Sequence, residues 1–88
     1  MKVIDYISEI RFECWFRDHR FSLEKEPAKS LWDGEWYAVV AGPDGCLVHD
    51  GYIKDSQDMT VKGAMIEACK GSVLAPPKRW PALLHGER

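Results

Sequence analysis

The strongest structural signal in the chain lies in residues 36–52, which read WYAVVAGPDGCLVHDGY. Residues 36–41 are rich in strand-forming side chains and apolar at successive positions, a pattern typical of a central strand. In the Gly42-Pro43-Asp44-Gly45 run that follows, proline presets the first turn position, aspartate accepts backbone hydrogen bonds and glycine adopts left-handed backbone angles. The stretch therefore predicts a β-hairpin with a return strand over about residues 46–54.

A second turn signal, Asp33-Gly34, precedes this hairpin and lies between two aromatic-rich stretches. Asp-Gly favours a tight two-residue turn, so a third antiparallel strand is expected before it. Further upstream, Pro27 and the four charged residues before it indicate a loop over residues 20–30, in which a short strand at Phe21–Leu23 is an alternative.

The first nineteen residues are expected to form a helix. Val3, Ile7, Ile10 and Cys14 are spaced four, three and four, which predicts a helix of about 16–18 residues. The alternation of apolar residues from Ile10 to Phe16 would suit a strand. The helix is preferred because the apolar stripe begins well before residue 10.

A second helix is expected after the hairpin. The stretch 55–60 is rich in residues that favour helix N-caps. Apolar residues then recur at 61, 64, 65, 68 and 69, which is the spacing of an amphipathic helix with one core face. Gly71 occupies the position where glycine commonly ends a helix.

These elements together predict an α+β fold: an N-terminal helix, a three-stranded antiparallel meander and a C-terminal helix, with both helices on one face of the sheet. The chain has 88 residues, which is the size of one domain with a small core. We expect this domain to span residues 1–75. A Pro-rich basic tail over 76–88 follows, because Pro76, Pro77 and Pro81 forbid a regular helix there.

The hairpin turn sets a predicted register that pairs Ala41 with Leu47. Trp36 then lies across from Tyr52 on one face of the sheet. The other face has bulkier aliphatic side chains and is expected to meet the helices. The predicted open face holds Trp36, Ala38, Val40, Val48, Asp50 and Tyr52. An exposed Trp36–Tyr52 pair beside a carboxylate is typical of protein interfaces, and plain cross-strand packing of the two rings is the alternative.

Charge is unevenly distributed along the chain. The net charge is −2, which disfavours bulk binding to nucleic acid or to membrane surfaces. Residues 24–58 hold eight acids and three bases, a net charge of −5, and such a field attracts a basic partner. A solvated surface with helix caps is the alternative. The residues expected to bind a partner protein are Asp33, Glu35, Trp36, Asp44, Asp50, Tyr52, Asp55 and Asp58.

The sequence offers little chemistry for catalysis. Its three cysteines occupy places where small apolar residues would serve, so buried free thiols are expected. Cys46 and His49 are an odd number of residues apart on one strand and point to opposite faces, which disfavours a zinc site. Phosphate-binding loops and hydrolase motifs are missing. We therefore expect no enzyme activity, cofactor or metal, and no direct binding to nucleic acid.

The compartment is expected to be the cytoplasm. No apolar run approaches the roughly 18 residues of a membrane span, and the start, MKVIDY, lacks the continuous apolar stretch of a signal peptide.

Three resemblances bear on function. The helix–three strands–helix order looks like the double-stranded-RNA-binding domain, whose last helix opens with a lysine cluster. Residues 55–62 here read DSQDMTVK, so that RNA-binding function is not carried over. The stretch from Trp36–Val40 through Gly45-Cys46 to the helix at Thr60–Lys70 is similar to HicB-type antitoxins. That resemblance implies a sheet-plus-helix protein that neutralises a small basic toxin.

The third resemblance is to phage-encoded anti-defence proteins, anti-CRISPRs among them. It rests on the short single domain, the missing catalytic motifs, the acidic residues 24–58 and the candidate pair Trp36 and Tyr52. Such proteins commonly cover a basic surface of a nucleic-acid-guided complex. The resemblance implies a non-enzymatic inhibitor that acts in the host bacterial cytoplasm, with a HicB-like antitoxin or regulatory partner protein as the alternative.

Overall fold

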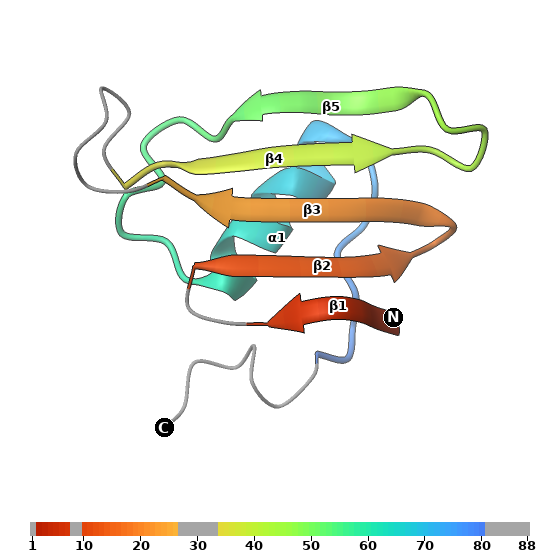
Figure 1. Cartoon of the computed structure of the whole chain (residues 1–88), viewed down its shortest axis with the longest axis horizontal. Helices are drawn as coiled ribbons and strands as arrows, with labels where there is room; N and C mark the ends of the chain where they lie inside the picture. The colour runs from red at the N-terminus through yellow and green to blue at the C-terminus, as the bar shows by residue number, and fades with distance from the viewer. Residues whose placement is uncertain (1, 8–9, 27–33, 81–88) are drawn as a thin grey trace.

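The computed structural model describes residues 2–7, 10–26 and 34–80 of the chain. Within them an antiparallel sheet of five strands, in the order β1-β2-β3-β4-β5, has one helix against one of its faces (Figure 1). The predicted α+β class is therefore confirmed. The elements are β1 Lys2–Ile7, β2 Arg11–Phe16, β3 His19–Lys25, β4 Trp36–Ala41, β5 Leu47–Tyr52 and α1 Val61–Gly71.

The predicted N-terminal helix is wrong, because this region forms β1 and β2. In β2 the side chains of Phe12, Cys14 and Phe16 are buried while Trp15 is exposed. This two-residue period is the alternation of a strand, and pairing with a neighbour on each side satisfies the backbone of β2. The apolar spacing from Val3 onward resembled a helix only because two strands were read as one element.

A tight hairpin joins β2 to β3 and extends the sheet beyond the predicted three strands. Phe16 pairs with His19, and the two turn residues between them have positive φ angles, 52° at Arg17 and 61° at Asp18. Two consecutive positive φ angles suit the twist of a two-residue hairpin. The expected loop over residues 20–30 is therefore wrong in its first half, since β3 includes and extends the short strand considered at Phe21–Leu23.

The connection from β3 to β4 is longer than the tight turn predicted at Asp33-Gly34. Lys25 pairs with Trp36, so the connection spans residues 26–35. Gly34 has a φ of 76°, which suits glycine. Asp33 lies outside the described residues.

The β4–β5 hairpin is confirmed, together with its turn. The amide of Gly42 donates to the Cys46 carbonyl at 2.8 Å, and Gly45 takes a φ of 86°. The predicted pairing of Ala41 with Leu47 is also confirmed. A register shift between Val40 and Ala41 then moves all the remaining pairs by one residue from the predicted register. As a result Tyr37, not Trp36, lies opposite Tyr52.

Helix α1 packs its predicted apolar face on the sheet. Val61, Ala64, Met65, Ala68 and Cys69 are buried, and Thr60 caps the helix by accepting from the Gly63 amide at 3.2 Å. The C-terminal end differs from the prediction. Gly71 is the last helical residue, and Val73 takes the left-handed backbone with a φ of 59°.

The core lies between α1 and β2–β4. Two helices were expected to cover the sheet, which is wrong for the described residues, because they form one helix.

The segments that flank α1 are fixed to the same core. The fully buried Ser56 accepts from the Trp36 amide at 2.8 Å and donates to the Ile53 carbonyl at 2.6 Å. After the helix, residues 73–80 pass behind the sheet (Figure 1), Pro77 is buried, and Leu74 and Trp80 pack against the core. One face of β3–β5 remains without a covering element among the described residues.

Candidate protein-binding site

The face of β3–β5 opposite α1 is the candidate site, and the bulge decides which side chains it presents. Trp36, Ala38 and Val40 are fully buried, so their expected exposure on the open face is wrong. The Trp36 indole nitrogen donates to the Met59 carbonyl at 3.0 Å, and Trp36 is a core residue, not a surface contact. The open face instead carries Tyr37 and Val39 from β4 with Asp50 and Tyr52 from β5.

Tyr37 and Tyr52 form an aromatic pair on this face. Their ring centroids are 4.9 Å apart at an interplanar angle of 77°, which is a T-shaped contact. The Tyr37 hydroxyl also donates to Asp50 on the neighbouring strand. Both rings are half-buried, so each presents part of its surface to solvent.

Carboxylates surround this aromatic pair. Glu24 lies directly opposite Tyr37 on β3, and Asp50 lies beside it on β5. The Glu26 amide donates to the Glu35 carbonyl at 3.0 Å where the chain leaves β3 and enters β4. Both carboxylates are close enough to Tyr52 to raise its pKa. We call Tyr37 and Tyr52 with Glu24, Glu26, Glu35 and Asp50 the tyrosine patch.

The surroundings of both phenols raise their pKa values. The hydrogen bond with Asp50, followed by partial desolvation, raises the pKa of Tyr37. Partial desolvation, then the charge and hydrogen bond of Glu26, raises the pKa of Tyr52. The charge of the tyrosine patch at neutral pH therefore comes from its carboxylates, and the surface is acidic and aromatic together.

The same face is basic on its β2 side. Glu13 accepts from Arg11 and from Arg20, each at 2.8 Å, and these hydrogen bonds hold its pKa below the ordinary value. The Glu13 side chain is 6% exposed while the two arginines remain about half exposed. The open face thus carries cations, Arg11 on β2 and Arg20 on β3, beside the carboxylates around the two tyrosines, and Arg11 lies directly opposite Glu24.

The structure brings together three of the sequence-predicted residues, Glu35, Asp50 and Tyr52. Asp44 lies at the other end of the β4–β5 hairpin, where its carboxylate accepts from the Cys46 amide at 3.0 Å. Asp55 and Asp58 are exposed in the connection to α1. The Asp55 amide donates to Glu35 at 3.0 Å, which ties that connection to the edge of the patch.

Sequence reasoning missed Tyr37, Glu24 and Glu26. Tyr37 was assigned to the opposite face, because the bulge between Val40 and Ala41 reverses the alternation. Glu24 and Glu26 were placed in a loop that is in fact the end of β3 and the residue after it. The alternation of apolar residues at Phe21 and Leu23 is the signal that could have revealed this strand.

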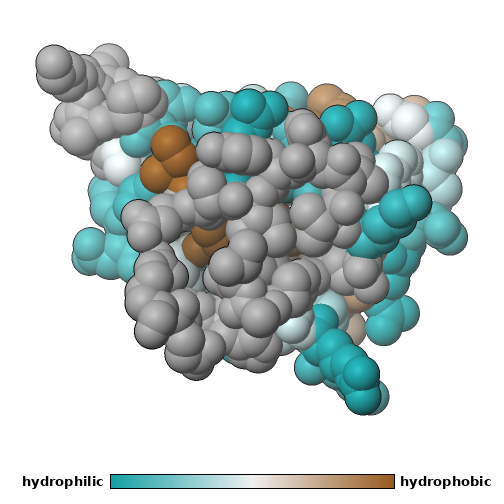
Figure 2. All heavy atoms as spheres, turned by 60° about the horizontal axis from the view of Figure 1, so that its bottom comes forward, coloured by the Kyte–Doolittle hydropathy of each residue, from teal (hydrophilic) through white to brown (hydrophobic). Residues whose placement is uncertain are grey.

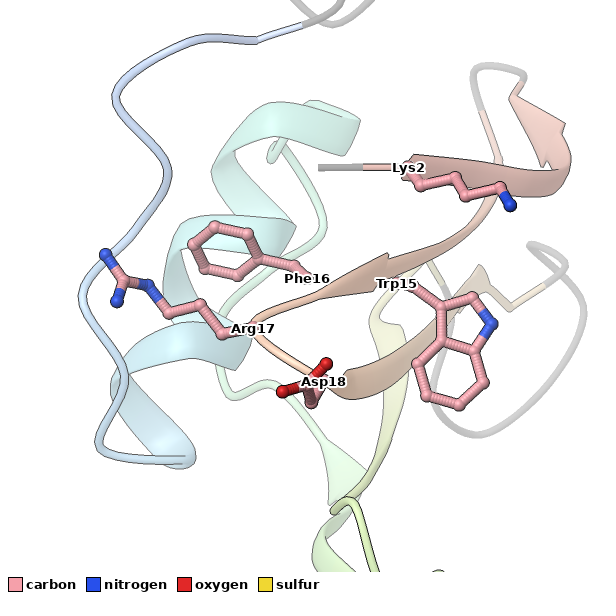
Figure 3. A pocket seen from close by; sticks show the side chains of 5 residues that line it. All are labelled: Lys2, Trp15, Phe16, Arg17 and Asp18. Carbon is pink, nitrogen blue, oxygen red and sulfur yellow. The ribbon is translucent and has the colours of Figure 1, made fainter.

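A separate open hollow of about 540 Å³ lies at the sheet edge near the β2–β3 turn, lined by Lys2, Trp15, Phe16, Arg17 and Asp18 (Figure 3). Lys2 and Trp15 point to one side of the sheet, while Phe16 and Arg17 point to the side of the helix. These side chains do not converge on one point. In Figure 2, where the β1 side comes forward, the described residues are mostly hydrophilic and hydrophobic ones show at few points.

The thiols and histidines do not form a metal site in the part of the chain that is described. No three His, Cys, Asp or Glu side chains within residues 2–7, 10–26 and 34–80 are close enough to hold a metal ion. Cys14 and Cys69 are buried as expected, and burial raises their pKa values to about 12 and about 11. Cys46 is exposed, so its expected burial is wrong.

Comparisons with protein-family models, with curated proteins and with solved structures find no match to this chain. In the described part of the chain, no helix is both long enough and apolar enough to span a bilayer.

Proposed function

We propose that this protein is a non-enzymatic inhibitor whose tyrosine patch binds a basic, nucleic-acid-binding surface of a bacterial defence complex, in the manner of an anti-CRISPR. The proposal places its action in the bacterial cytoplasm, with a phage as the source of the protein. It requires no cofactor.

The observation that supports the proposal most is the T-shaped Tyr37–Tyr52 pair bordered by Glu24 and Asp50 on the open sheet face. Aromatic rings supply contact area that can be desolvated at the centre of an interface. Carboxylates around them attract the lysines and arginines of a nucleic-acid-binding surface and disfavour partners of the same charge. Arginine also stacks on tyrosine faces, so both parts of the patch select a cation.

A HicB-like antitoxin is the second candidate, because a small basic toxin presents the same chemistry. The β4–β5 hairpin followed by α1, which carries that resemblance, is present. The helix–strands–helix order that suggested an RNA-binding domain is not the order found, since β1 and β2 replace the first helix.

The first experiment identifies the partner and measures inhibition. Affinity capture from a bacterial lysate, read by mass spectrometry, should yield a nucleic-acid-guided effector. A small basic toxin would favour the second candidate. Expression of the protein in a host with an active CRISPR system should restore transformation by a targeted plasmid, and transformation that stays blocked against every system tested would contradict the inhibitor proposal.

The second experiment locates the binding surface. Glu24→Lys with Asp50→Lys should slow association about tenfold or more at low salt, and the loss should shrink as salt rises. Asp44→Lys with Glu67→Lys makes the same change in net charge outside the patch and is the control. Tyr52→Ala should mainly speed dissociation, at a cost of about 2–4 kcal/mol of binding free energy.

The outcome that would contradict this surface is equal slowing by both charge-reversal variants. The general charge of the chain, not the tyrosine patch, would then drive association. Circular dichroism on each variant confirms that the sheet is retained.

A further inference from the structure

We infer that the partner contributes an extended segment, with basic residues at alternate positions, which adds as a sixth strand to the free edge of β5. The inference rests on the proposed function, since it specifies how a basic partner reaches the tyrosine patch. It concerns the backbone of β5, whereas the proposed function concerns side chains.

The free edge follows from the order of the sheet. β5 is the last strand, and no described strand lies beyond it. The Ile53 amide donates to the Trp36 carbonyl at 2.8 Å, so the backbone of residue 53 faces β4. Antiparallel strands alternate the direction of their backbone groups, so between the bulge and Ile53 the residues His49 and Gly51 also face β4 while Asp50 directs its amide and carbonyl outward. These outward groups are what an added strand pairs with.

The composition of β5 suits pairing more than that of the opposite edge. Edge strands are commonly protected by lysines. The other edge strand, β1, begins with Lys2. β5 contains no lysine or arginine, and the side chains of Leu47 and Val48 are 56% and 46% exposed.

Charge determines which segment fits this edge. A second copy of the chain paired symmetrically about residue 50 would place Asp50 opposite Asp50, which is repulsive. A foreign strand with Lys or Arg on the open face places cations next to Asp50 and within reach of the tyrosine patch. On the other face, a Cβ built at Gly51 meets nothing within 4 Å, so there is room for apolar side chains of the added strand.

The test uses a synthetic peptide, acetyl-VKVKVKV-amide, with acetyl-VEVEVEV-amide as the acidic control. In an NMR titration of the full chain, the basic peptide should slow exchange of the Asp50 amide proton by about tenfold or more. The amides of His49 and Gly51, which already face β4, should change less. The acidic peptide should have no effect.

Variants at Asp50 separate backbone pairing from side-chain contact. Asp50→Pro and Asp50→Ala both remove the carboxylate, but only Asp50→Pro also removes the outward amide proton, and it does so without removing a bond to β4. Asp50→Pro should therefore bind the peptide about tenfold more weakly than Asp50→Ala. If Asp50→Pro does not fold, as judged by circular dichroism, the exchange measurement on the wild-type chain carries the test alone.

Three results would overturn the inference. Equal binding by Asp50→Pro and Asp50→Ala, with sensitivity to the double variant Glu24→Lys with Asp50→Lys, leaves the proposed function intact and removes the strand addition. Equal protection of β5 by both peptides shows that the edge does not select a basic segment. A dimer in light scattering that Asp50→Pro dissociates and Asp50→Ala does not assigns the edge to a second copy. If neither the charge reversals nor Asp50→Pro affects binding of the basic peptide or the captured partner, the proposed function fails as well.

Discussion

The Glu13 side chain is almost fully buried, on the face of the sheet opposite α1. It keeps its charge because Arg11 and Arg20 both donate to it, and their hydrogen bonds lower its pKa. The arginines are half exposed, so they retain much of their hydration while the carboxylate loses its own. Charged hydrogen bonds of this kind stabilise a fold more than exposed ion pairs do.

Glu13→Gln should therefore lower the free energy of unfolding by about 1–2 kcal/mol at pH 7. The folded pKa of Glu13 lies below its unfolded value, so its stabilising effect is complete above the unfolded pKa, near 4.5, and is lost as pH falls through the folded pKa. Urea unfolding of both proteins should show the difference at pH 7 and a smaller one below the ordinary carboxyl range. A constant difference across that range would contradict the ionic role of Glu13.

The three thiols should differ in reactivity because their burial differs. Burial raises the pKa of Cys14 to about 12 and that of Cys69 to about 11, while Cys46 is exposed in the hairpin turn. Since the thiolate is the reactive form, an aromatic disulfide reagent at pH 8 should label Cys46 rapidly. Cys14 and Cys69 should react only after unfolding in denaturant. Cys46→Ser should abolish the rapid phase, and a rapid phase that persists in this variant would show that a buried thiol is accessible.

At the scale of the elements, the end of α1 lies close to the His49 side chain of β5. A Cβ at Gly71 would lie 2.8 Å from Nδ1 of His49, a distance at which the ring must move. The Nε2 atom of the same ring is buried without a hydrogen-bond partner among the described residues. Glycine at the end of α1 therefore serves the contact with the edge strand, not the left-handed helix end for which glycine is usually selected.

Gly71→Ala should destabilise the fold by about 1 kcal/mol, because the steric cost exceeds the gain in helix propensity. In a His49→Ala background the steric cost disappears, so the same substitution should be neutral or stabilise by up to about 1 kcal/mol. Chemical denaturation of the four proteins of this double-mutant cycle measures the coupling. Additive effects would show that the two residues do not interact.

At the scale of the whole molecule, the segment after α1 is part of the packing. The Trp80 ring is half-buried against the core, and the Lys62 ammonium lies 5.6 Å from its centroid. Residues 73–80 and α1 lie on the same side of the sheet, opposite the tyrosine patch (Figure 1). The helix-side packing and the proposed binding surface thus lie on opposite faces of the sheet.

Trp80→Ala should lower the free energy of unfolding by about 1–2 kcal/mol, less than the loss of a fully buried tryptophan. Trp80→Phe, which keeps an aromatic ring, should recover most of the loss. Neither substitution should change the rate at which the captured partner associates. Slower association with Trp80→Ala at a temperature where the variant is folded would place part of the interface on the helix side.

The local sequence was sufficient for features whose physical cause is local. The Gly42–Gly45 turn, the pairing of Ala41 with Leu47, and the buried face of α1 each depend on a few neighbouring residues, and each was predicted. The α+β class followed from the same signals. The acidic character of residues 24–58 was also readable, since charge does not depend on folding.

The rest depended on contacts between distant residues. Whether residues 2–16 form a helix or two strands is settled by pairing with β3, because a strand needs a neighbour to satisfy its backbone while the same apolar spacing tolerates a helix. The bulge at Val40 and Ala41 exchanges the two faces of β4 relative to β5 and puts Tyr37 beside Tyr52 in place of Trp36. One residue of register moves every side chain to the other face, so the composition of the tyrosine patch was fixed by the packed sheet and not by the residue pattern.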